Sequence, residues 1–400
     1  MINQKKYPHA LINANALLNN IKIAKEKWNG PLIVPVKANA YGHDSVLVSK
    51  VMQDSGLVKL LAVARVDEGL HLRQNGITMP IFTLGVELDD ESDIQNAIQN
   101  DIELSVSDIE NVKTIAVVAE KLNKTISLHI KLDTGFSRLG VNPKNVLELA
   151  GFISKSPYLH FASMYTHFAM SESDEDFTRR QLAILTDAVA RLAEYNIVAD
   201  MYHCYNSGAI LYGIFDDERQ AEYEAKNGYN IPKMSSLGIG PFGMRPGILT
   251  YGYAPNCDGY KLGLQPVMTL VTHVIHTNDV PAGTGVCYNH TYKTTKPCRL
   301  ATIPLGYGDG ISRSLSNKLT VMINGNVYHQ VGRVTMDLIV IETDEYVNVG
   351  DKVIVFGSKP QCHQDADDLA AIQGTISYEI TTDIAARVER VLSKNEKKSG

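Results

Sequence analysis

The sequence predicts a (β/α)8 barrel followed by a second domain built mostly of β-strands. Over the first part of the chain, short apolar runs rich in β-branched residues alternate with longer stretches of helical spacing. Eight such runs fit the eight strands of a barrel, with a doubly wound open sheet as the alternative. After residue 262 the helical spacing disappears. We therefore expect a barrel over residues 10–262 and a β-domain over residues 263–392, against which residues 1–9 are able to pack.

Each predicted element follows from a local pattern. The barrel strands are expected at residues 31–37, 60–64, 81–85, 102–106, 126–133, 159–167, 201–207 and 248–252. Helices are expected in "VDEGLHLRQ" (66–74), "IENVKTIAVVAEKL" (109–122), "NVLELAGFI" (145–153) and "EDFTRRQLAILTDAVARLAEY" (175–195). The β-domain strands are expected in "MTLVTHVIH", "CRLATIPLG", "LTVMING", "YHQVGRV", "LIVIET" and "KVIVFG". The chain then closes with one amphipathic helix over residues 376–392.

Composition and charge argue against several classes of partner. The chain has a formal net charge of −6 and therefore lacks the basic surface that binds nucleic acid. No apolar run approaches the ~20 residues that span a bilayer, and the N-terminus lacks the apolar core of a signal peptide. The five cysteines form no C-x-x-C pair, and no metal-binding spacing occurs. We expect a cytoplasmic protein without a nucleic-acid, membrane or metal partner.

Several predicted barrel strands end in polar residues. Lys37 ends the first apolar run, His167 the sixth, and Asn206 and Ser207 the seventh. In barrels of this kind the chemistry sits at the C-terminal ends of the strands, so these residues would share one rim. A lysine there can form a Schiff base or clamp a phosphate. A surface lysine that happens to follow a strand is the alternative.

A Schiff-base lysine needs a carbonyl partner, usually pyridoxal phosphate. This cofactor needs a dianion site, a flat wall for its ring and a partner for its ring nitrogen. Ser207 and the backbone of Gly247 and Ile248 lie where barrels tend to bind phosphate. His167 could lie against the ring and Arg245 could face its nitrogen. The alternatives are a core histidine and a salt-bridged structural arginine.

The stretch "VKANAYGHD" (36–44) resembles the pyridoxal-phosphate lysine motif of alanine racemases. The resemblance continues in order along most of the chain. It includes "AVARVDEGLHLR" (62–73), "HIKLDTGFSRLGV" (129–141), "YTHFA" (165–169), "HCYNSGA" (203–209), "MRPGILTYGYAP" (244–255), "PLGYGDG" (304–310), "GRVTMD" (332–337) and "ISYEI" (376–380). Several motifs in one order make this a strong signal.

The resemblance implies roles for individual residues. Lys37 carries pyridoxal phosphate and later acts as one base, while Tyr288 in "GVCYNHTY" is the second base. The implied cofactor site contains Tyr41, His167, Asn206, Ser207, Arg245, Gly247, Ile248 and Tyr378. Arg138 and the backbone of Met336 would bind the substrate carboxylate, with Lys131, His203, Tyr307 and Asp337 in supporting positions. Lys131 falls where some members carry a carbamylated lysine.

Two bases on opposite faces invert an α-carbon without motion of the reacting molecule. Lysine and tyrosine have ordinary pKa values near 10, which must fall for either to act as a base at pH 7. The resemblance thus implies interconversion of L- and D-alanine, which supplies peptidoglycan synthesis, by a homodimer whose active sites are shared across the interface. The alternatives are a racemase of another amino acid such as serine, a pyridoxal-phosphate decarboxylase, or a non-catalytic protein that binds the cofactor.

Three features depart from the family pattern. The tyrosine motif reads "VCYNH" instead of having a small residue before the tyrosine and glycine after it. Thr335 stands where cysteine is common, and the stretch from residue 208 to 244 is longer than expected. That stretch would shape substrate access or the dimer contact, or be a solvated excursion.

Overall fold

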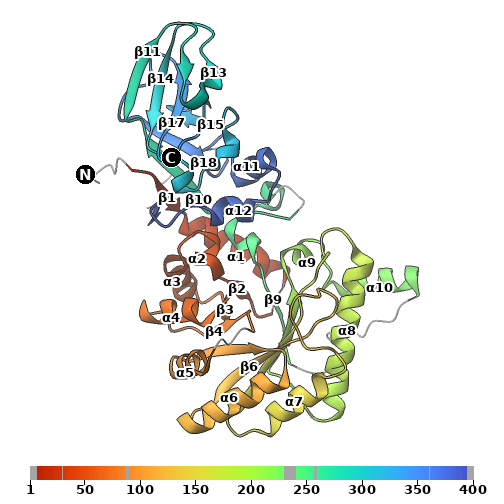
Figure 1. The fold of residues 1–400 in the computed structure, drawn as a ribbon. Helices are drawn as coiled ribbons and strands as arrows, with labels where there is room; N and C mark the ends of the chain where they lie inside the picture. The colour runs from red at the N-terminus through yellow and green to blue at the C-terminus, as the bar shows by residue number, and fades with distance from the viewer. Residues whose placement is uncertain are drawn as a thin grey trace.

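The chain folds around two sheets. A computed structural model describes residues 7–28, 30–86, 90–228, 240–255, 259–359 and 361–393. One sheet has eight strands and the other nine, with a small two-stranded sheet beside the larger one. Figure 1 shows the eight-stranded unit surrounded by helices in the lower part of the molecule and the β-rich unit above it. Among the described residues, no helix is long and apolar enough to cross a membrane.

The eight-stranded sheet is the predicted parallel barrel. Its strands follow the chain in order, and each pairs in parallel with the next. They are β2 (Ile33–Pro35), β3 (Leu60–Val63), β4 (Ile81–Thr83), β5 (Ile102–Val106), β6 (Ile126–Lys131), β7 (Leu159–Tyr165), β8 (Met201–Tyr205) and β9 (Phe242–Met244). A parallel bridge between Leu32 and Met244 joins the last strand to the first. The barrel prediction is therefore confirmed over the open sheet.

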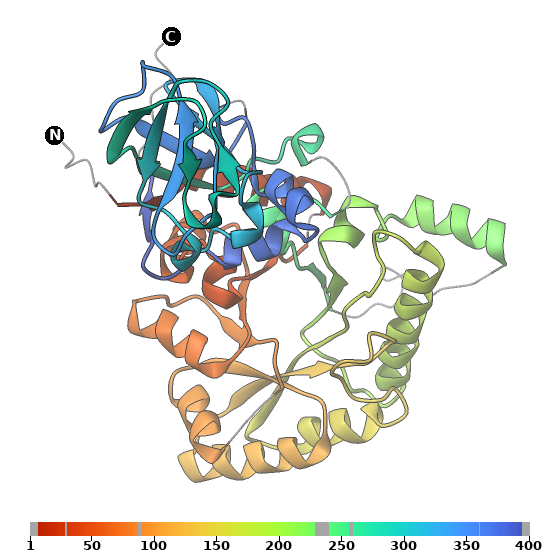
Figure 2. The same ribbon diagram turned by 45° about the horizontal axis from the view of Figure 1, so that its top comes forward.

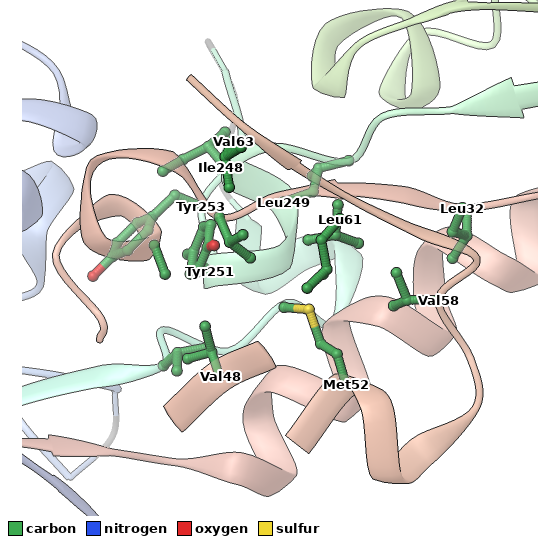
Figure 3. Packing of buried hydrophobic residues seen from close by; sticks show 14 of the residues in the cluster. Leu32, Val48, Met52, Val58, Leu61, Val63, Ile248, Leu249, Tyr251 and Tyr253 are labelled. Carbon is green, nitrogen blue, oxygen red and sulfur yellow. The ribbon is translucent and has the colours of Figure 1, made fainter. Parts of the chain in front are cut away.

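The eighth strand was placed wrongly. The run at 248–252 forms a buried 3-10 helix, η2 (Ile248–Tyr251), which ends at Gly252 with φ 96°. The true strand is only three residues long and contains a glycine, so its signal is weak. A fully apolar run does not distinguish a strand from a buried helical turn, because periodicity is lost in both. Figure 3 shows Ile248 and Tyr251 of η2 packed near Leu61 of β3 and Met52.

Helices cover the outside of the barrel. The four helices predicted from sequence appear as α4 (Val66–Gln74), α6 (Ile109–Leu122), α7 (Val146–Lys155) and α8 (Glu175–Glu194). The other helices near the barrel are α1 (Ala14–Lys27), α2 (Lys37–Tyr41), α3 (Ser45–Ser55), α5 (Glu91–Gln99) and α9 (Ser207–Leu211). Asp108 and Asp174 cap α6 and α8 by accepting from backbone N–H groups in the first turn. Their buried apolar stripes pack against the strands.

The long stretch from residue 208 to 244 contains a further helix, α10 (Asp217–Asn227). Figure 2 shows it projecting from the side of the barrel beyond α8. Arg219 of α10 pairs with Glu175 at 2.9 Å, and the Tyr223 hydroxyl donates to Asp176 at 2.8 Å. These contacts fasten α10 to the start of α8. Residues 229–239 of the stretch lie outside the described residues.

The nine-stranded sheet combines strands from both ends of the chain. Its order is β11, β14, β17, β16, β15, β18, β10, β1, β19. Seven of its strands come from residues 268–356: β10 (Met268–His273), β11 (His276–Val280), β14 (Cys298–Ile303), β15 (Thr320–Ile323), β16 (Asn326–Gln330), β17 (Ile339–Thr343) and β18 (Lys352–Phe356). β1 (His9–Ile12) lies between β10 and β19 (Glu389–Leu392). The first strand of the chain, β1, thus belongs to this sheet and not to the barrel. The division into domains at residue 262 stays a prediction.

The closing helix predicted over residues 376–392 is wrong. Only α12 (Ser377–Thr382) is helical there, and the chain then becomes β19. Pairing with β1 overrides the helical pattern of the sequence. A second helix, α11 (Ala366–Gln373), precedes α12 and begins at a capping box made by Asp365 and Asp368.

Candidate active site

A cavity of about 600 Å³ opens at the C-terminal ends of the barrel strands. It collects most of the residues that the sequence singled out. Its lining includes Lys37, Tyr41, Lys131, Arg138, His167, Asn206, Ser207, Arg245, Gly247, Ile248 and Tyr378. All but Tyr378 come from the barrel side, and Tyr378 comes from α12. His203 is not in the lining but lies fully buried behind Arg245.

The backbone after Lys37 is left-handed. Ala38, Asn39, Ala40 and Tyr41 all have φ between 51° and 55°, so α2 is a turn of left-handed helix made without glycine. Such strain persists only where the surroundings fix it. The Glu68 carboxylate accepts from Ala38 N at 2.7 Å, and the Asn39 side chain accepts from Ser45 N at 2.8 Å. The turn fixes how Lys37 enters the cavity.

The lysines of the cavity are electrostatically destabilised as cations. Burial, followed by the positive charge of Arg138, lowers the pKa of Lys37, while Glu68 opposes the shift. Burial and the same arginine lower the pKa of Lys131 to about 8. Both amines are therefore closer to neutral than a surface lysine. A neutral amine can act as a nucleophile or take up a proton.

Arg245 is held by the protein on four of its five donors. Its Nη2 donates to Thr166 O at 2.6 Å and approaches His167 Nδ1 at 3.4 Å. Its Nη1 donates to His203 O at 3.1 Å and to His203 Nδ1. The guanidinium also lies over the Tyr165 ring, 5.3 Å from its centroid. Nε has no partner among the described residues, and the residue lines the cavity, so one N–H is left for a ligand.

A small cradle lies beside this arginine. A Cβ at Gly247 would stand 3.3 Å from the Tyr41 hydroxyl and 3.6 Å from Ser207 Oγ, so glycine leaves room between two hydroxyl groups. Tyr41 stacks on Tyr251 at 4.9 Å and touches Tyr378 at 5.9 Å. Two hydroxyls and an open backbone suit a small anion.

His167 and Arg138 form one wall of the cavity. Burial and Arg245 lower the pKa of His167 well below its ordinary value, so its ring is neutral at pH 7. His167 packs edge-on against Phe136 at 5.2 Å, and the Arg138 guanidinium lies over the same ring at 4.4 Å. Asn206 plays a structural part here, because its side chain caps α9 and accepts from Ser171 at 2.8 Å.

Four predicted site residues lie elsewhere in the chain. Tyr288, Tyr307, Met336 and Asp337 belong to the β-domain, and none lines the barrel cavity of its own chain. Tyr288 is 72% exposed in the short turn η4 (Tyr288–His290), and Met336 is 54% exposed. Met336 O accepts from Gly308 N at 2.9 Å, and Asp337 pairs with Arg387 at the same distance.

Glu68 is a site residue that the sequence did not single out. Its two carboxylate oxygens accept from Ala38 N and Ala64 N, which joins the ends of β2 and β3. Glu68 lies within "AVARVDEGLHLR" (62–73). Its partners are backbone N–H groups, which every residue type except proline offers, so the sequence does not show which residues it binds. Among the described residues, no group of His, Cys, Asp and Glu could hold a metal ion.

A closed parallel barrel with a polar cavity at its C-terminal strand ends, joined to a mostly antiparallel sheet, belongs to the class of barrel proteins whose functional site lies at that rim. The family model of the alanine racemase N-terminal domain matches residues 12–222, and that of the C-terminal domain matches residues 267–392. The chain belongs to the alanine racemase family.

Individual relatives match over nearly the whole chain. The alanine racemase of Methanococcus maripaludis is 37% identical over 96% of this chain and 97% of its own. That of Cutibacterium acnes is 34% identical over 96% of both. Among solved structures, the alanine racemase of Clostridium difficile 630 has a TM-score of 0.83 at 32% identity, covering 97% of this chain and 96% of its own. A structure from Bacillus anthracis, with bound L-Ala-P, has a TM-score of 0.83 at 32% identity, covering 98% and 96%.

Proposed function

We propose that this chain interconverts L- and D-alanine with pyridoxal phosphate, using Lys37 and Tyr288 as bases on opposite faces of the substrate. One observation carries the proposal: in a member of the alanine racemase family, a single cavity joins the Lys37 amine, the free Arg245 donor and the Gly247 cradle. The relative from Bacillus anthracis binds L-Ala-P and one from Clostridium difficile binds cycloserine, both small amino-acid-like molecules. These relatives favour alanine over a larger substrate.

The residues present fit the cofactor. Arg245 offers one unpaired N–H toward the cavity, which suits an unprotonated ring nitrogen, because arginine only donates. Tyr41 and Ser207 flank an open backbone at Gly247, which suits a phosphate. Lys37 supplies an amine of lowered pKa. When bound, pyridoxal phosphate provides the electron sink that stabilises negative charge at the α-carbon of an amino acid.

The chain's own residues would then move one proton. The Lys37 amine takes or returns the α-proton on one face, and the Tyr288 hydroxyl does so on the other. Arg138 lies in the cavity where it can bind a carboxylate and orient the substrate. Its charge also contributes to lowering the pKa of Lys37. Fixed bases on two faces remove the need for the substrate to turn over between the two proton transfers.

Tyr288 reaches such a site in a homodimer. It is exposed on the β-domain of its own chain, so we propose that it completes the cavity of the partner subunit. Met336, Tyr307 and Asp337 lie on the same domain and would accompany it. The supporting observation is that Tyr288 lies in a turn where Cys287, Asn289 and His290 have positive φ, a strained conformation typical of functional turns.

We further propose a cytoplasmic enzyme that supplies D-alanine for peptidoglycan. The described cysteines are all free thiols, in keeping with a reducing compartment. A racemase of another small amino acid such as serine is the second candidate, because the proton chemistry is the same and the "VCYNH" and Thr335 departures lie near the substrate residues.

The test is exchange of the α-proton of each enantiomer in D2O, followed by NMR for wild type, Lys37→Ala and Tyr288→Phe. We expect both alanine enantiomers to exchange in wild type. Tyr288→Phe should impair proton removal from one enantiomer far more than from the other, and Lys37→Ala should abolish exchange. Cofactor binding with no exchange of either alanine or serine would instead identify a non-catalytic binding protein, while an equal small loss for both enantiomers would contradict the two-base assignment.

A further inference from the structure

One side of the barrel interior is polar, although barrel cores are usually filled with branched apolar side chains. Ile33, Leu60, Ala62 and Phe82 form the apolar side, contributed by β2, β3 and β4. On the other side, four successive strands contribute one polar residue each to a row of contacting side chains. These are Glu103 of β5, His129 of β6, Ser163 of β7 and His203 of β8.

The row is continuous from Glu103 in β5 to Arg245, which lines the cavity. Glu103 Oε2 lies 2.6 Å from His129 Nε2, and His129 Nδ1 lies 2.6 Å from Ser163 Oγ. Ser163 Oγ lies 3.1 Å from His203 Nε2, and His203 Nδ1 accepts from Arg245 Nη1. His129, Ser163 and His203 are at most 1% exposed, whereas the Glu103 side chain is 25% exposed. Five neighbouring segments of the barrel thus link the arginine of the cavity to a carboxylate near solvent.

With both histidine rings neutral, the row has one consistent arrangement of protons. Arginine can only donate, so His203 Nδ1 must accept and the proton of its neutral ring lies on Nε2. His203 Nε2 then donates to Ser163, whose hydroxyl is free to donate to His129 Nδ1. His129 therefore carries its proton on Nε2 and donates it to the Glu103 carboxylate. Burial and the charge of Arg245 keep the pKa of His203 well below its ordinary value, in agreement with a neutral ring.

We propose that Glu103, His129, Ser163 and His203 act as one directional hydrogen-bond chain that keeps the His203 Nδ1 lone pair turned to Arg245 and so aims the free Arg245 N–H into the cavity. Glu103 is then a positioning residue for the reaction, although three side chains separate it from Arg245. The inference rests on the proposed function only in that Arg245 faces the cofactor ring. The hydrogen-bonded row itself can be tested without measuring catalysis.

The surroundings of the row suit this role. Phe82 packs against both rings, 4.5 Å from the His129 centroid and 5.7 Å from that of His203. Tyr165 stacks on His203 at 4.7 Å with an interplanar angle of 12°. These buried rings exclude water, so a histidine that loses its partner in the row has no solvent to replace it. In the opposite tautomer, His203 would carry its proton on Nδ1 and point an N–H at the guanidinium of Arg245.

The experiment compares Glu103→Leu with Glu103→Gln in the full-length protein labelled with [15N]histidine. Glutamine keeps a carbonyl oxygen that accepts from His129 Nε2, whereas leucine accepts nothing. In Glu103→Gln we expect the rings of His129 and His203 to remain Nε2–H tautomers. The tautomers are read by 15N NMR with and without pyridoxal phosphate. Leu should shift His203 Nδ1 toward the protonated type and lower kcat roughly tenfold, as losses of supporting hydrogen bonds do at other sites. KM should change little.

Two further variants test whether the effect of Glu103 on His203 passes through the row. In Ser163→Ala, His203 Nε2 loses its acceptor, so adding Glu103→Leu should no longer change the His203 signals. Ser105→Ala is the matched control, since it removes a buried hydroxyl that bonds Tyr165 at 2.9 Å but lies outside the row. A Glu103→Leu protein in which only His129 responds, or in which Gln and Leu behave alike, overturns the proposal. Failure of racemisation in wild type would leave the tautomer result standing, so the two proposals fail separately.

Discussion

At the scale of single residues, the turn after Lys37 carries the most unusual backbone of the site. Four consecutive residues without glycine lie in the left-handed region, at a cost of roughly 1–2 kcal/mol each. Hydrogen bonds that the Glu68 and Asn39 side-chain oxygens accept from backbone N–H groups offset this strain. The letters "KANAYGHD" identify the lysine through resemblance, but they do not predict the turn, because alanine and tyrosine rarely adopt this conformation.

Replacing Ala38 with glycine should therefore stabilise the protein. Glycine adopts positive φ freely, so we expect the free energy of unfolding to rise by up to about 1 kcal/mol, against the usual effect of glycine. The matched control is Ala116→Gly in α6, where a normal helical backbone predicts a loss of about 1 kcal/mol. Urea denaturation of both variants tests this. Equal losses for the two would show that Ala38 is not strained.

His43 makes stability depend on pH. Its Nδ1 lies 3.1 Å from Ala40 O and 2.9 Å from Tyr41 O, so it carries the proton, while Nε2 is buried without a partner among the described residues. Burial lowers the pKa of His43 to about 4. The unfolded chain, with a pKa near 6.5, binds more protons between those values, so stability rises with pH across this window.

Above pH 6.5 the lowered pKa of His43 has no effect on stability, and we expect it to lower the free energy of unfolding by up to roughly 3 kcal/mol as the pH falls from 6.5 toward 4. Denaturation of wild type and His43→Phe at pH 7 and pH 5 isolates it, because every other titrating group is shared. Between pH 7 and pH 5, wild type should lose stability relative to His43→Phe. A difference that is constant with pH would show that His43 does not titrate in this window.

At the scale of elements, the sequence predicted what depends on local pattern. The helices at 66–74 and 109–122 appear with the predicted bounds, because each has a clear apolar stripe. The errors at 248–252 and 376–392 have different causes. The run at 248–252 is short and largely apolar, so it carries no periodicity that separates a strand from the buried turn η2. At 376–392 a distant segment decides the structure, because β19 pairs with β1.

Arg390 shows how such a distant contact is fixed. Its guanidinium donates to Gly42 O at 2.9 Å and to Ala385 O and Val388 O at 2.6 Å, so β19 is fastened to the loop that follows α2. We expect Arg390→Ala to lower the free energy of unfolding by about 2 kcal/mol, as for other hydrogen bonds to charged groups.

Arg390→Lys should recover less than half of that loss, because an ammonium cannot present donors to several carbonyls in one plane. Thermal and urea unfolding of the two variants provide the measurement. Full recovery by lysine would indicate that charge alone, and not the geometry of the guanidinium, holds β19 in place.

At the scale of the whole molecule, the predicted barrel residues meet in one cavity, whereas the predicted residues of the β-domain do not line the cavity of their own chain. Lys37, Arg245, Gly247 and Ser207 meet at the barrel rim as expected from strand-end positions. Tyr288 and Met336 remain exposed on the β-domain. The family resemblance implies that Tyr288 acts across a dimer interface, whereas strand order and spacing within one chain do not, because a site shared across an interface depends on symmetry.

Mixing two defective proteins tests whether the site is shared. Lys37→Ala and Tyr288→Phe should each give poorly active homodimers. If each site takes its lysine from one subunit and its tyrosine from the other, a mixed dimer contains one intact site and one doubly altered site. Random reassociation in equal amounts should then restore about a quarter of the wild-type activity, since half of the dimers are mixed and half of their sites are intact.

The matched control is a mixture of Lys37→Ala with the double variant Lys37→Ala/Tyr288→Phe, in which no subunit supplies Lys37. It should stay inactive under the same unfolding and refolding treatment. Activity is measured as conversion of L-alanine to D-alanine, which needs both bases, after confirming dimers by sedimentation. No recovery in the first mixture, with mixed dimers present, would mean that Lys37 and Tyr288 do not act in one site built from two subunits.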